Sequence, residues 1–268
     1  MKFNIHAGHN PDGKVACGAV GLIKESTEAR KVKDKVIQYL RKEGHTVYDC
    51  TCNNGTSKND VLREIVEKCN SRNVDIDVSI HFNSGAKDKK GNGETTGVEV
   101  FVYKETSKCF AEAVRVGKKI KELGFKNRGI KVNASLYVLK HTNAPAMLIE
   151  VCFVDDKDDV ALYQKNVDKI SKAIAEALIN KKIEDKPKSN NTVNTNKSKD
   201  NSFKVKVKVK ELNYRSGAGT EYKVKGSIKD KGTYTIIKTA KSKDGGNWGQ
   251  LKSKAGWINI SSKYVDRL

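Results

Sequence analysis

The sequence predicts an α/β domain, in which a mostly parallel twisted sheet is flanked by helices, followed by a small all-β barrel. Three observations support this prediction. Short apolar strands alternate with amphipathic helices over residues 1–180, a polar stretch over 181–202 has almost no apolar content, and strict two-residue alternation begins at 203. With 268 residues, the chain is long enough for a sizeable core and a smaller second unit.

The elements of the first domain follow one another in a regular order. We expect strands over 2–6, 45–50, 75–82, 97–103, 136–140 and 146–152. We expect helices near 25–43, 58–71, 107–123 and 166–180. This alternation favours a sheet with helices on both faces. The polar, glycine-rich stretch 85–97 follows the third strand, and we expect it to border the cleft.

The first helix and the third strand are marked most clearly. In the helix, Ala29, Val32 and Val36 lie on one apolar stripe, and Gly44 follows as a stop signal. The strand is an apolar run that ends at the polar residue His81, where an open α/β sheet places its ligands.

Four polar side chains lie at positions that are typical of metal ligands or catalytic groups. His9 and His81 follow short apolar strands, and Glu25 opens the first helix. Glu150 interrupts an apolar run over 147–153, where a carboxylate is costly to bury unless it is paired or used. Catalytic zinc takes three protein ligands, so His9, Glu25 and His81 fit a zinc site. Glu150 is then free to act as the proton-transferring group.

Other residues compete for these roles. A lone histidine at a strand end is more often a hydrogen-bonded structural residue than a ligand. Glu28 lies one helical turn from Glu25 and is its alternative. His6 is a rival first ligand, although strand alternation points it to the side opposite His9. His141 fits the cleft and ordinary packing equally well.

Four segments together carry a resemblance to a known family: FNIHAGHN at 3–10, LIKESTEARKV at 22–32, DIDVSIHFNS at 75–84 and NAPAMLIEVCFVDD at 143–156. They resemble the type 3 N-acetylmuramoyl-L-alanine amidases over residues 1–180. These zinc enzymes cut the amide between the muramic acid lactyl group and the first alanine of peptidoglycan. The resemblance implies one Zn²⁺ per chain, held by His9, Glu25 and His81, with Glu150 as the catalytic base.

The family pattern favours Glu25 over Glu28, because its ligand glutamate stands about nineteen residues before a glycine, as Glu25 stands before Gly44. The sequence departs from the pattern at three places that touch no proposed ligand. His6-Ala7 replaces Asp-Pro, Cys152 replaces a glycine, and Arg30 replaces an apolar residue.

The second domain, over 203–268, resembles the bacterial SH3 modules that bind cell walls. The segments that carry this resemblance are LNYRSGAGT at 212–220 and GGNWGQLKSKAGWINISSKYV at 245–265. Candidate wall-binding residues are Tyr214, Arg215, Tyr222 and Trp248. Core packing explains Tyr214 and Tyr222 equally well, whereas Trp248 lies in a glycine-rich polar turn and is the better candidate for the binding face. Trp257 is expected in the core, because it lies in a strand of alternating apolar residues.

Charge indicates the kind of partner. Residues 181–268 hold 22 Lys and Arg against 8 Asp and Glu, so +14 of the net +20 lies in the linker and second domain. Such an excess favours an anionic polymer, for example the teichoic acids of a Gram-positive wall. Nucleic acid is another anionic partner, but lysine outnumbers arginine 44 to 8, whereas specific readers of nucleic acid rely on arginine. The lysine-rich composition also suggests a clostridial host.

The remaining features concern the cell compartment. The six cysteines form no CxxC set, so we expect reduced, buried thiols. The first strand begins almost at the first residue, and no apolar stretch is as long as a membrane span. We therefore expect a protein made in the host cytoplasm without a signal peptide, which reaches the wall through a phage holin.

These features together predict an endolysin, with a flexible linker over 181–202 between a zinc amidase and a wall-binding module. The alternatives are a prophage-derived or housekeeping autolysin of the same activity, and a zinc peptidase that cuts another amide of peptidoglycan. A non-catalytic wall-binding protein and a nucleic-acid-binding protein are further alternatives from other classes.

Overall fold

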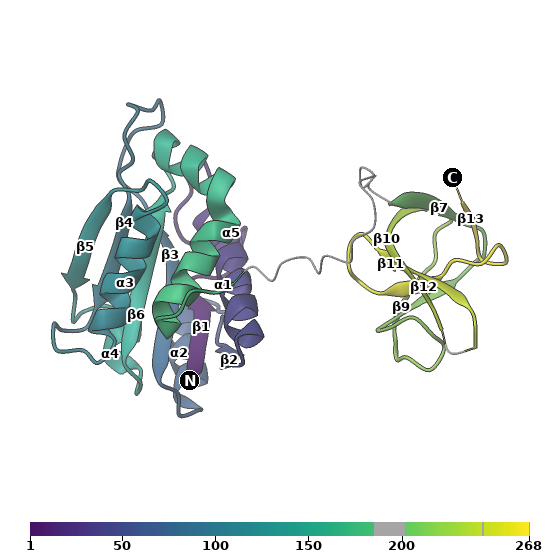
Figure 1. Cartoon of the computed structure of the whole chain (residues 1–268), viewed down its shortest axis with the longest axis horizontal. Coiled ribbons are helices and arrows are strands. Elements are labelled where there is room, and N and C mark those ends of the chain that lie inside the picture. The colour runs from purple at the N-terminus through teal and green to yellow at the C-terminus, as the bar shows by residue number, and fades with distance from the viewer. Residues whose placement is uncertain (185–201, 243, 268) are drawn as a thin grey trace. The chain divides into compact units, whose positions relative to one another are not determined.

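The computed structural model describes residues 1–184, 202–242 and 244–267 (Figure 1). Its contacts divide the chain into two compact units, over 1–186 and 187–268. Most of the linker expected over 181–202 lies outside the described residues. In the part of the chain that is described, no helix combines the length and the apolar content needed to cross a bilayer.

The first unit contains a six-stranded mixed sheet with the order β2-β1-β3-β6-β4-β5. The strands are β1 (Lys2–Ala7), β2 (Thr46–Asp49), β3 (Ile76–Asn83), β4 (Val98–Val102), β5 (Asn127–Val132) and β6 (Ala146–Phe153). Only the pair β4 and β6 is antiparallel, and the other four pairs are parallel. The expected α/β class, with a mostly parallel sheet, is therefore confirmed.

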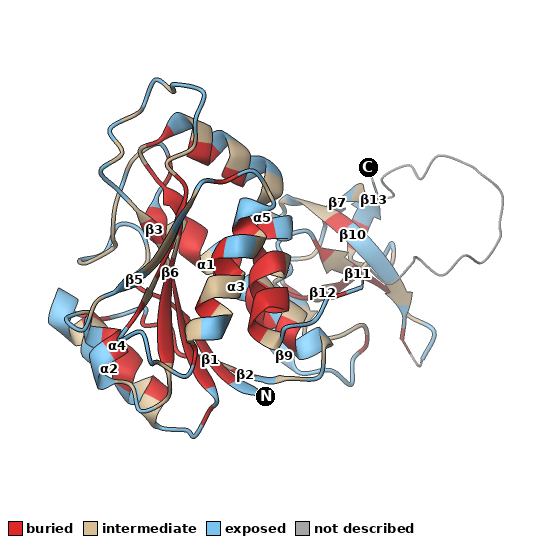
Figure 2. Cartoon of the chain, turned by 60° about the vertical axis from the view of Figure 1, so that its left-hand side comes forward, coloured by how far each residue is buried: buried red, intermediate tan, exposed pale blue. Residues whose placement is uncertain are grey.

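Helices cover both faces of this sheet. They are α1 (Glu25–Lys42), α2 (Lys58–Asn70), α3 (Phe110–Lys121), α4 (Tyr137–His141) and α5 (Lys157–Ile179). Helices α1, α3 and α5 pack in the larger core cluster, and α2 and α4 pack in a smaller one on the opposite face. In Figure 2, buried residues fill the middle strands of the sheet and the sides of the helices that face them.

The structure corrects three expected elements. The segment 136–140, expected as a strand, forms helix α4, and strand β5 was not expected at all. β5 is an edge strand with little burial, so its sequence lacks the apolar run that marks inner strands. Helix α5 begins at Lys157 rather than near 166, because the Asp156 side chain caps it by accepting a hydrogen bond from the Asp159 N–H.

The second unit is a single antiparallel sheet with the order β13-β7-β10-β11-β12-β8-β9. The strands are β7 (Phe203–Val207), β8 (Leu212–Arg215), β9 (Val224–Ile228), β10 (Thr233–Lys241), β11 (Asn247–Leu251), β12 (Trp257–Asn259) and β13 (Val265–Arg267). In β7, Val205 and Val207 are buried while Lys204 and Lys206 are exposed, as the two-residue alternation predicts. The expected all-β unit is confirmed.

Candidate metal centre

Three side chains from separate elements meet at one point of the first unit. His9 follows β1, Glu25 is the first residue of α1, and His81 lies near the end of β3. One ligand atom from each lies within 4.8 Å of the other two. Glu25 Oε1 is 2.9 Å from His81 Nδ1 and 3.2 Å from His9 Nε2. Two imidazoles and one carboxylate at this spacing are a donor set that suits zinc.

Two glycines make room for these side chains. A Cβ atom on Gly8 would lie 1.8 Å from Nε2 of His81, and a Cβ atom on Gly18 would lie 2.5 Å from Oε2 of Glu25. Gly18 also has a φ of +82°, which side-chain-bearing residues rarely adopt. The chain around the site therefore accepts only glycine at these positions without moving a proposed ligand.

The electrostatics of the cluster suit cation binding. Burial alone would raise the pKa of Glu25, but hydrogen bonds with His81 and His9 outweigh burial and hold this pKa well below its usual range. Burial lowers the pKa of His81, against the raising effect of Glu25. The site therefore offers a charged carboxylate beside a neutral imidazole, which are the protonation states that bind metal.

Backbone groups orient Glu25. The Ala19 N–H donates a hydrogen bond to Glu25 Oε2 over 2.7 Å, and the Phe82 N–H donates one to Glu25 Oε1 over 3.2 Å. Hydrogen bonds of this kind fix the direction of a ligand before the metal arrives.

Arg30 holds the backbone of His9 in place, a role that the sequence reasoning did not assign. Its Nη2 donates hydrogen bonds to the carbonyl oxygen of His9 over 2.7 Å and to that of Cys52 over 3.0 Å. Its Nη1 donates to the carbonyl oxygen of Ser26 over 3.1 Å. The guanidinium thereby joins α1, the end of β1 and the segment after β2.

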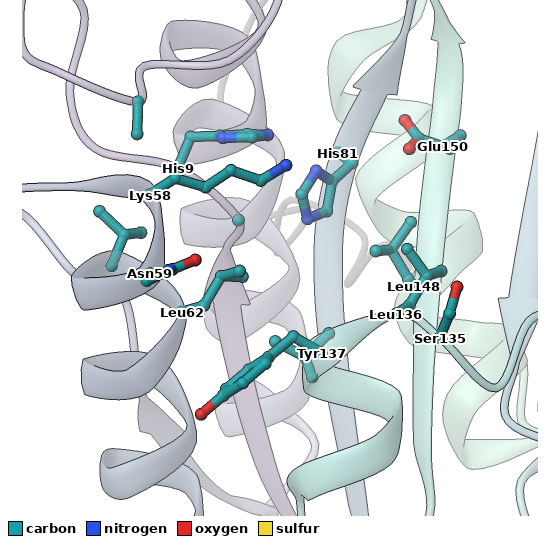
Figure 3. Close-up of a pocket in the computed structure, with 14 residues that line it drawn as sticks. His9, Lys58, Asn59, Leu62, His81, Ser135, Leu136, Tyr137, Leu148 and Glu150 are labelled. Carbon is teal, nitrogen blue, oxygen red and sulfur yellow. The ribbon is translucent and has the colours of Figure 1, made fainter.

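Glu150 lies beside the cluster and lines the same pocket as His9 and His81 (Figure 3). It pairs with His81 in the register of β3 and β6, and with Glu99 in the register of β4 and β6. Its Oε2 is buried without a hydrogen-bond partner among the described residues. Burial, and then the charges of Glu25 and Glu99, raise the pKa of Glu150 well above its usual range. A carboxyl group whose charged form is disfavoured in this way is suited to proton transfer in the pocket that it lines.

The pocket is a cavity of about 440 Å³ between the proposed ligands and the helices α2 and α4. Its apolar lining includes Val61 and Leu62 of α2, Leu136 and Val138 beside and within α4, and Leu148 of β6. Its polar lining residues beyond the metal cluster and Glu150 are Lys58, Asn59, Ser135 and Tyr137. A cavity of this size, with an apolar lining and a few polar groups, is suited to a peptide-like ligand.

The glycine-rich loop over 85–97 contributes no residue to this pocket, so the expectation that it borders the cleft is wrong here. The start of α5 holds the loop instead. The Asp155 carboxylate accepts backbone N–H groups from residues 85–87, and the Asp158 carboxylate accepts the N–H of Gly93 over 2.8 Å.

A second acidic group, Asp88, Asp156 and Asp158, also brings carboxylate oxygens within 4.8 Å of one another. These carboxylates serve the same loop. Asp156 accepts hydrogen bonds from the N–H and the hydroxyl of Thr96, and Asp88 accepts one from the Gly91 N–H. These carboxylates therefore stabilise the loop by accepting hydrogen bonds from its backbone N–H groups and from the Thr96 hydroxyl.

The rival ligands lie elsewhere. His6 is buried, with Nδ1 3.4 Å from Ser79 Oγ, and burial lowers its pKa to about 3. Glu28 accepts a hydrogen bond from the Tyr163 hydroxyl over 2.9 Å and pairs with Lys31. His141 is exposed and does not line the pocket. All six cysteines are free thiols, and five of them are buried, as expected.

The candidate wall-binding residues of the second unit have different surroundings. Tyr222 is 44% exposed, whereas Tyr214 packs partly against the core. Arg215 donates hydrogen bonds to the carbonyl oxygens of Thr220 and Tyr222, so it braces the loop between β8 and β9.

Trp248 corrects an expectation. It is only 3% exposed, and its indole Nε1 donates a hydrogen bond to Ser242 Oγ over 3.2 Å. The prediction that Trp248 lies on an exposed binding face is therefore wrong. The indole N–H finds its hydrogen-bond partner in Ser242, which is itself buried, so the glycine-rich sequence around Trp248 does not expose this side chain. Trp257, expected in the core, is partly buried.

Known proteins are similar to this chain in sequence. An uncharacterized protein from Clostridium perfringens is 34% identical over 230 residues, which are 85% of this chain and 66% of that protein. The chain therefore spans about two thirds of the length of that relative. The endolysin of Bacillus phage SPP1 is 29% identical over 281 residues, which are 97% of this chain and 96% of the endolysin.

Solved structures and a family match agree with these relatives. The catalytic domain of an endolysin that targets Clostridium difficile has a TM-score of 0.61 and 30% identity, covering 69% of this chain and 99% of that domain. Residues 4–180 match the N-acetylmuramoyl-L-alanine amidase family. Because this match covers more than half of the chain, the chain belongs to the N-acetylmuramoyl-L-alanine amidase family.

Proposed function

We propose that this amidase cuts the lactyl-alanine amide of peptidoglycan with one zinc ion, held by His9, Glu25 and His81. The observation that carries the proposal is the meeting of these three side chains in one pocket beside Glu150, whose buried Oε2 has no hydrogen-bond partner among the described residues. When bound, zinc supplies a Lewis acid for hydrolysis of the amide. The glycines at positions 8 and 18 leave the space that this arrangement requires.

In this proposal, Glu150 moves the proton. Its carboxylate takes a proton from the attacking water while the water oxygen bonds to the lactyl carbonyl carbon. The carbon–nitrogen bond then breaks, and Glu150 passes the proton to the departing alanine nitrogen. The products are a lactyl carboxylate and a peptide with a free alanine amino terminus. The buried, apolar surroundings of Glu150 favour its protonated form between these two steps.

The second unit is proposed to bind the wall as an SH3-like module. Its all-β fold and the LNYRSGAGT segment support this role, with Tyr222, Tyr214 and Arg215 as candidate contacts. The exposed lysines of β7, at 204 and 206, suit attraction to anionic wall polymers. The clostridial relative and the phage endolysin support a Gram-positive, clostridial wall and a phage lysin. Such a lysin reaches the wall from the host cytoplasm after a holin opens the membrane.

One digestion tests the bond. Purified Gram-positive wall is treated with the protein, and the new chemical ends are identified by dinitrophenylation and mass spectrometry. We expect new amino termini on L-alanine, with a matching gain of free lactyl carboxylate. New amino termini on any other residue would assign the activity to a peptidase instead, and new reducing ends would assign it to a glycosidase.

A further inference from the structure

The pocket extends beyond the proposed ligands to a basic side chain that the reaction does not use. Lys58, the first residue of α2, is the one lysine or arginine among the lining residues of this pocket in the described part of the chain. In Figure 3 its side chain reaches from α2 into the pocket, toward the two histidines. The pocket thus has a positive charge on the α2 side of the metal cluster.

The acidic neighbours of Lys58 on α2 are occupied by other cations. Asp60 pairs with Arg63 over 2.5 Å, and Glu64 pairs with Lys68 over 2.5 Å. No carboxylate pairs with Lys58 among the residues that the structure describes. Its ammonium group is therefore available to a ligand that enters the pocket.

The chemistry of the substrate provides a matching anion. The stem peptide of peptidoglycan begins with L-alanine, and its second residue is a D-glutamate joined through its side-chain carboxyl. The main-chain carboxyl of that residue is therefore a free anion, unless the organism amidates it. A residue of extended chain spans about 3.5 Å, so this carboxylate lies only about one residue length beyond the alanine that carries the scissile amide.

We propose that Lys58 is a specificity-determining residue, which binds the free carboxylate of the second stem-peptide residue. The apolar side chains of Leu62 and Leu148 then face the alanine methyl group between the cleaved amide and this carboxylate. The inference rests on the proposed function, because it places the scissile amide at the metal cluster. It predicts that the enzyme discriminates stem peptides by charge.

The test compares two soluble muramoyl dipeptides, one with a free carboxyl on its second residue and one with that carboxyl amidated. For the wild-type chain we expect kcat/KM to be about tenfold higher for the free carboxylate, as for a charged hydrogen bond. In Lys58→Met this ratio should fall to near one, mainly through KM. Lys58→Arg should keep most of the ratio. The matched control is Lys121→Met, which removes an exposed lysine of α3 that does not line the pocket.

Binding of the product dipeptides, measured by calorimetry, keeps this inference separate from the catalytic proposal. If neither muramoyl dipeptide is cleaved by any variant, the proposed reaction is wrong. The ratio of the dissociation constants of the amidated and the free product dipeptide still tests Lys58. A wild-type chain that treats the free and amidated dipeptides alike, or a Lys58→Met variant that keeps the preference, overturns the assignment of Lys58.

Discussion

Glu150 lies directly across from His81 in the register of β3 and β6, and the Oε2 atom of its buried carboxyl has no partner among the described residues. Side chains at paired positions of adjacent strands point to the same face of a sheet. The proposed base and a proposed ligand are therefore fixed beside each other by backbone hydrogen bonds rather than by a flexible loop.

The first prediction separates proton transfer from metal binding. Glu150→Gln keeps the shape of the side chain but removes the group that accepts a proton. Zinc content should stay near the wild-type value, while turnover of soluble wall fragments falls by ~10² or more. Both quantities are measured on the same preparation. Loss of zinc from this variant would make Glu150 a ligand and would contradict the proposed mechanism.

The second prediction concerns the metal itself. The purified protein should carry close to one zinc per chain, and chelation should abolish lysis reversibly, because the three ligands meet only in the folded domain. His81→Ala should lose most of the zinc. His141→Ala is the control, since His141 is exposed and outside the pocket. Stoichiometric zinc in His81→Ala would show that the ligands are assigned wrongly.

The third prediction tests the role of Arg30. Its guanidinium bridges the carbonyl oxygens of His9 and Cys52, so its removal frees the backbone that carries a proposed ligand. Arg30→Met should weaken zinc affinity by about tenfold, measured by competition with a chelator of known affinity. Arg30→Lys should not restore it, because an ammonium group lacks the planar fork of donors.

Arg63→Met serves as the control for Arg30, since Arg63 is exposed on α2 and its ion pairs among the described residues are with Asp60 and Glu67 of the same helix. If Arg30→Met binds zinc as tightly as the wild-type chain, Arg30 does not position the proposed ligand His9, and its hydrogen bonds serve only the stability of the fold.

The sequence predicted much of the first unit, because its inner strands and main helices carry strong apolar patterns. These patterns predicted where β1 and β3 end, and therefore singled out His9 and His81 as residues at or after strand ends. The segment of α4 was expected as a strand, and Tyr137 and Val138 do favour strands locally, but packing of this segment against α2 decides the outcome. Trp248 was expected to be exposed because the residues around it are polar and rich in glycine. Local sequence does not show that tertiary packing buries its side chain.

The fourth prediction concerns the end of the first unit. Ile183 is fully buried in the core cluster of this unit, and its N–H donates a hydrogen bond to the Glu176 carboxylate over 2.9 Å. A fragment of residues 1–180 lacks this side chain, whereas a fragment of residues 1–184 keeps it. The shorter fragment should have a free energy of unfolding lower by about 2 kcal/mol, from the lost apolar burial. Urea unfolding of both fragments measures the difference, and coincident transitions would show that Ile183 adds nothing.

The last prediction tests whether the first unit carries the hydrolytic activity and the second unit carries the binding to intact walls. The fragment of residues 1–184 should keep its zinc and hydrolyse soluble wall fragments, because it contains the whole candidate site. It should attach weakly to intact walls, because +13 of the net charge lies beyond residue 184. Residues 203–268 alone should sediment with walls without cutting them.

Part of the binding of residues 203–268 to walls should fall with added salt, since exposed charges are screened beyond about 10 Å at 0.1 M. Tyr222→Ala, at an exposed aromatic, should weaken the salt-resistant part, while Lys206→Ala, at an exposed lysine of β7, should affect only the salt-dependent part. If residues 203–268 fail to sediment with the walls of every Gram-positive species tried, clostridia included, the second unit is not a wall-binding module.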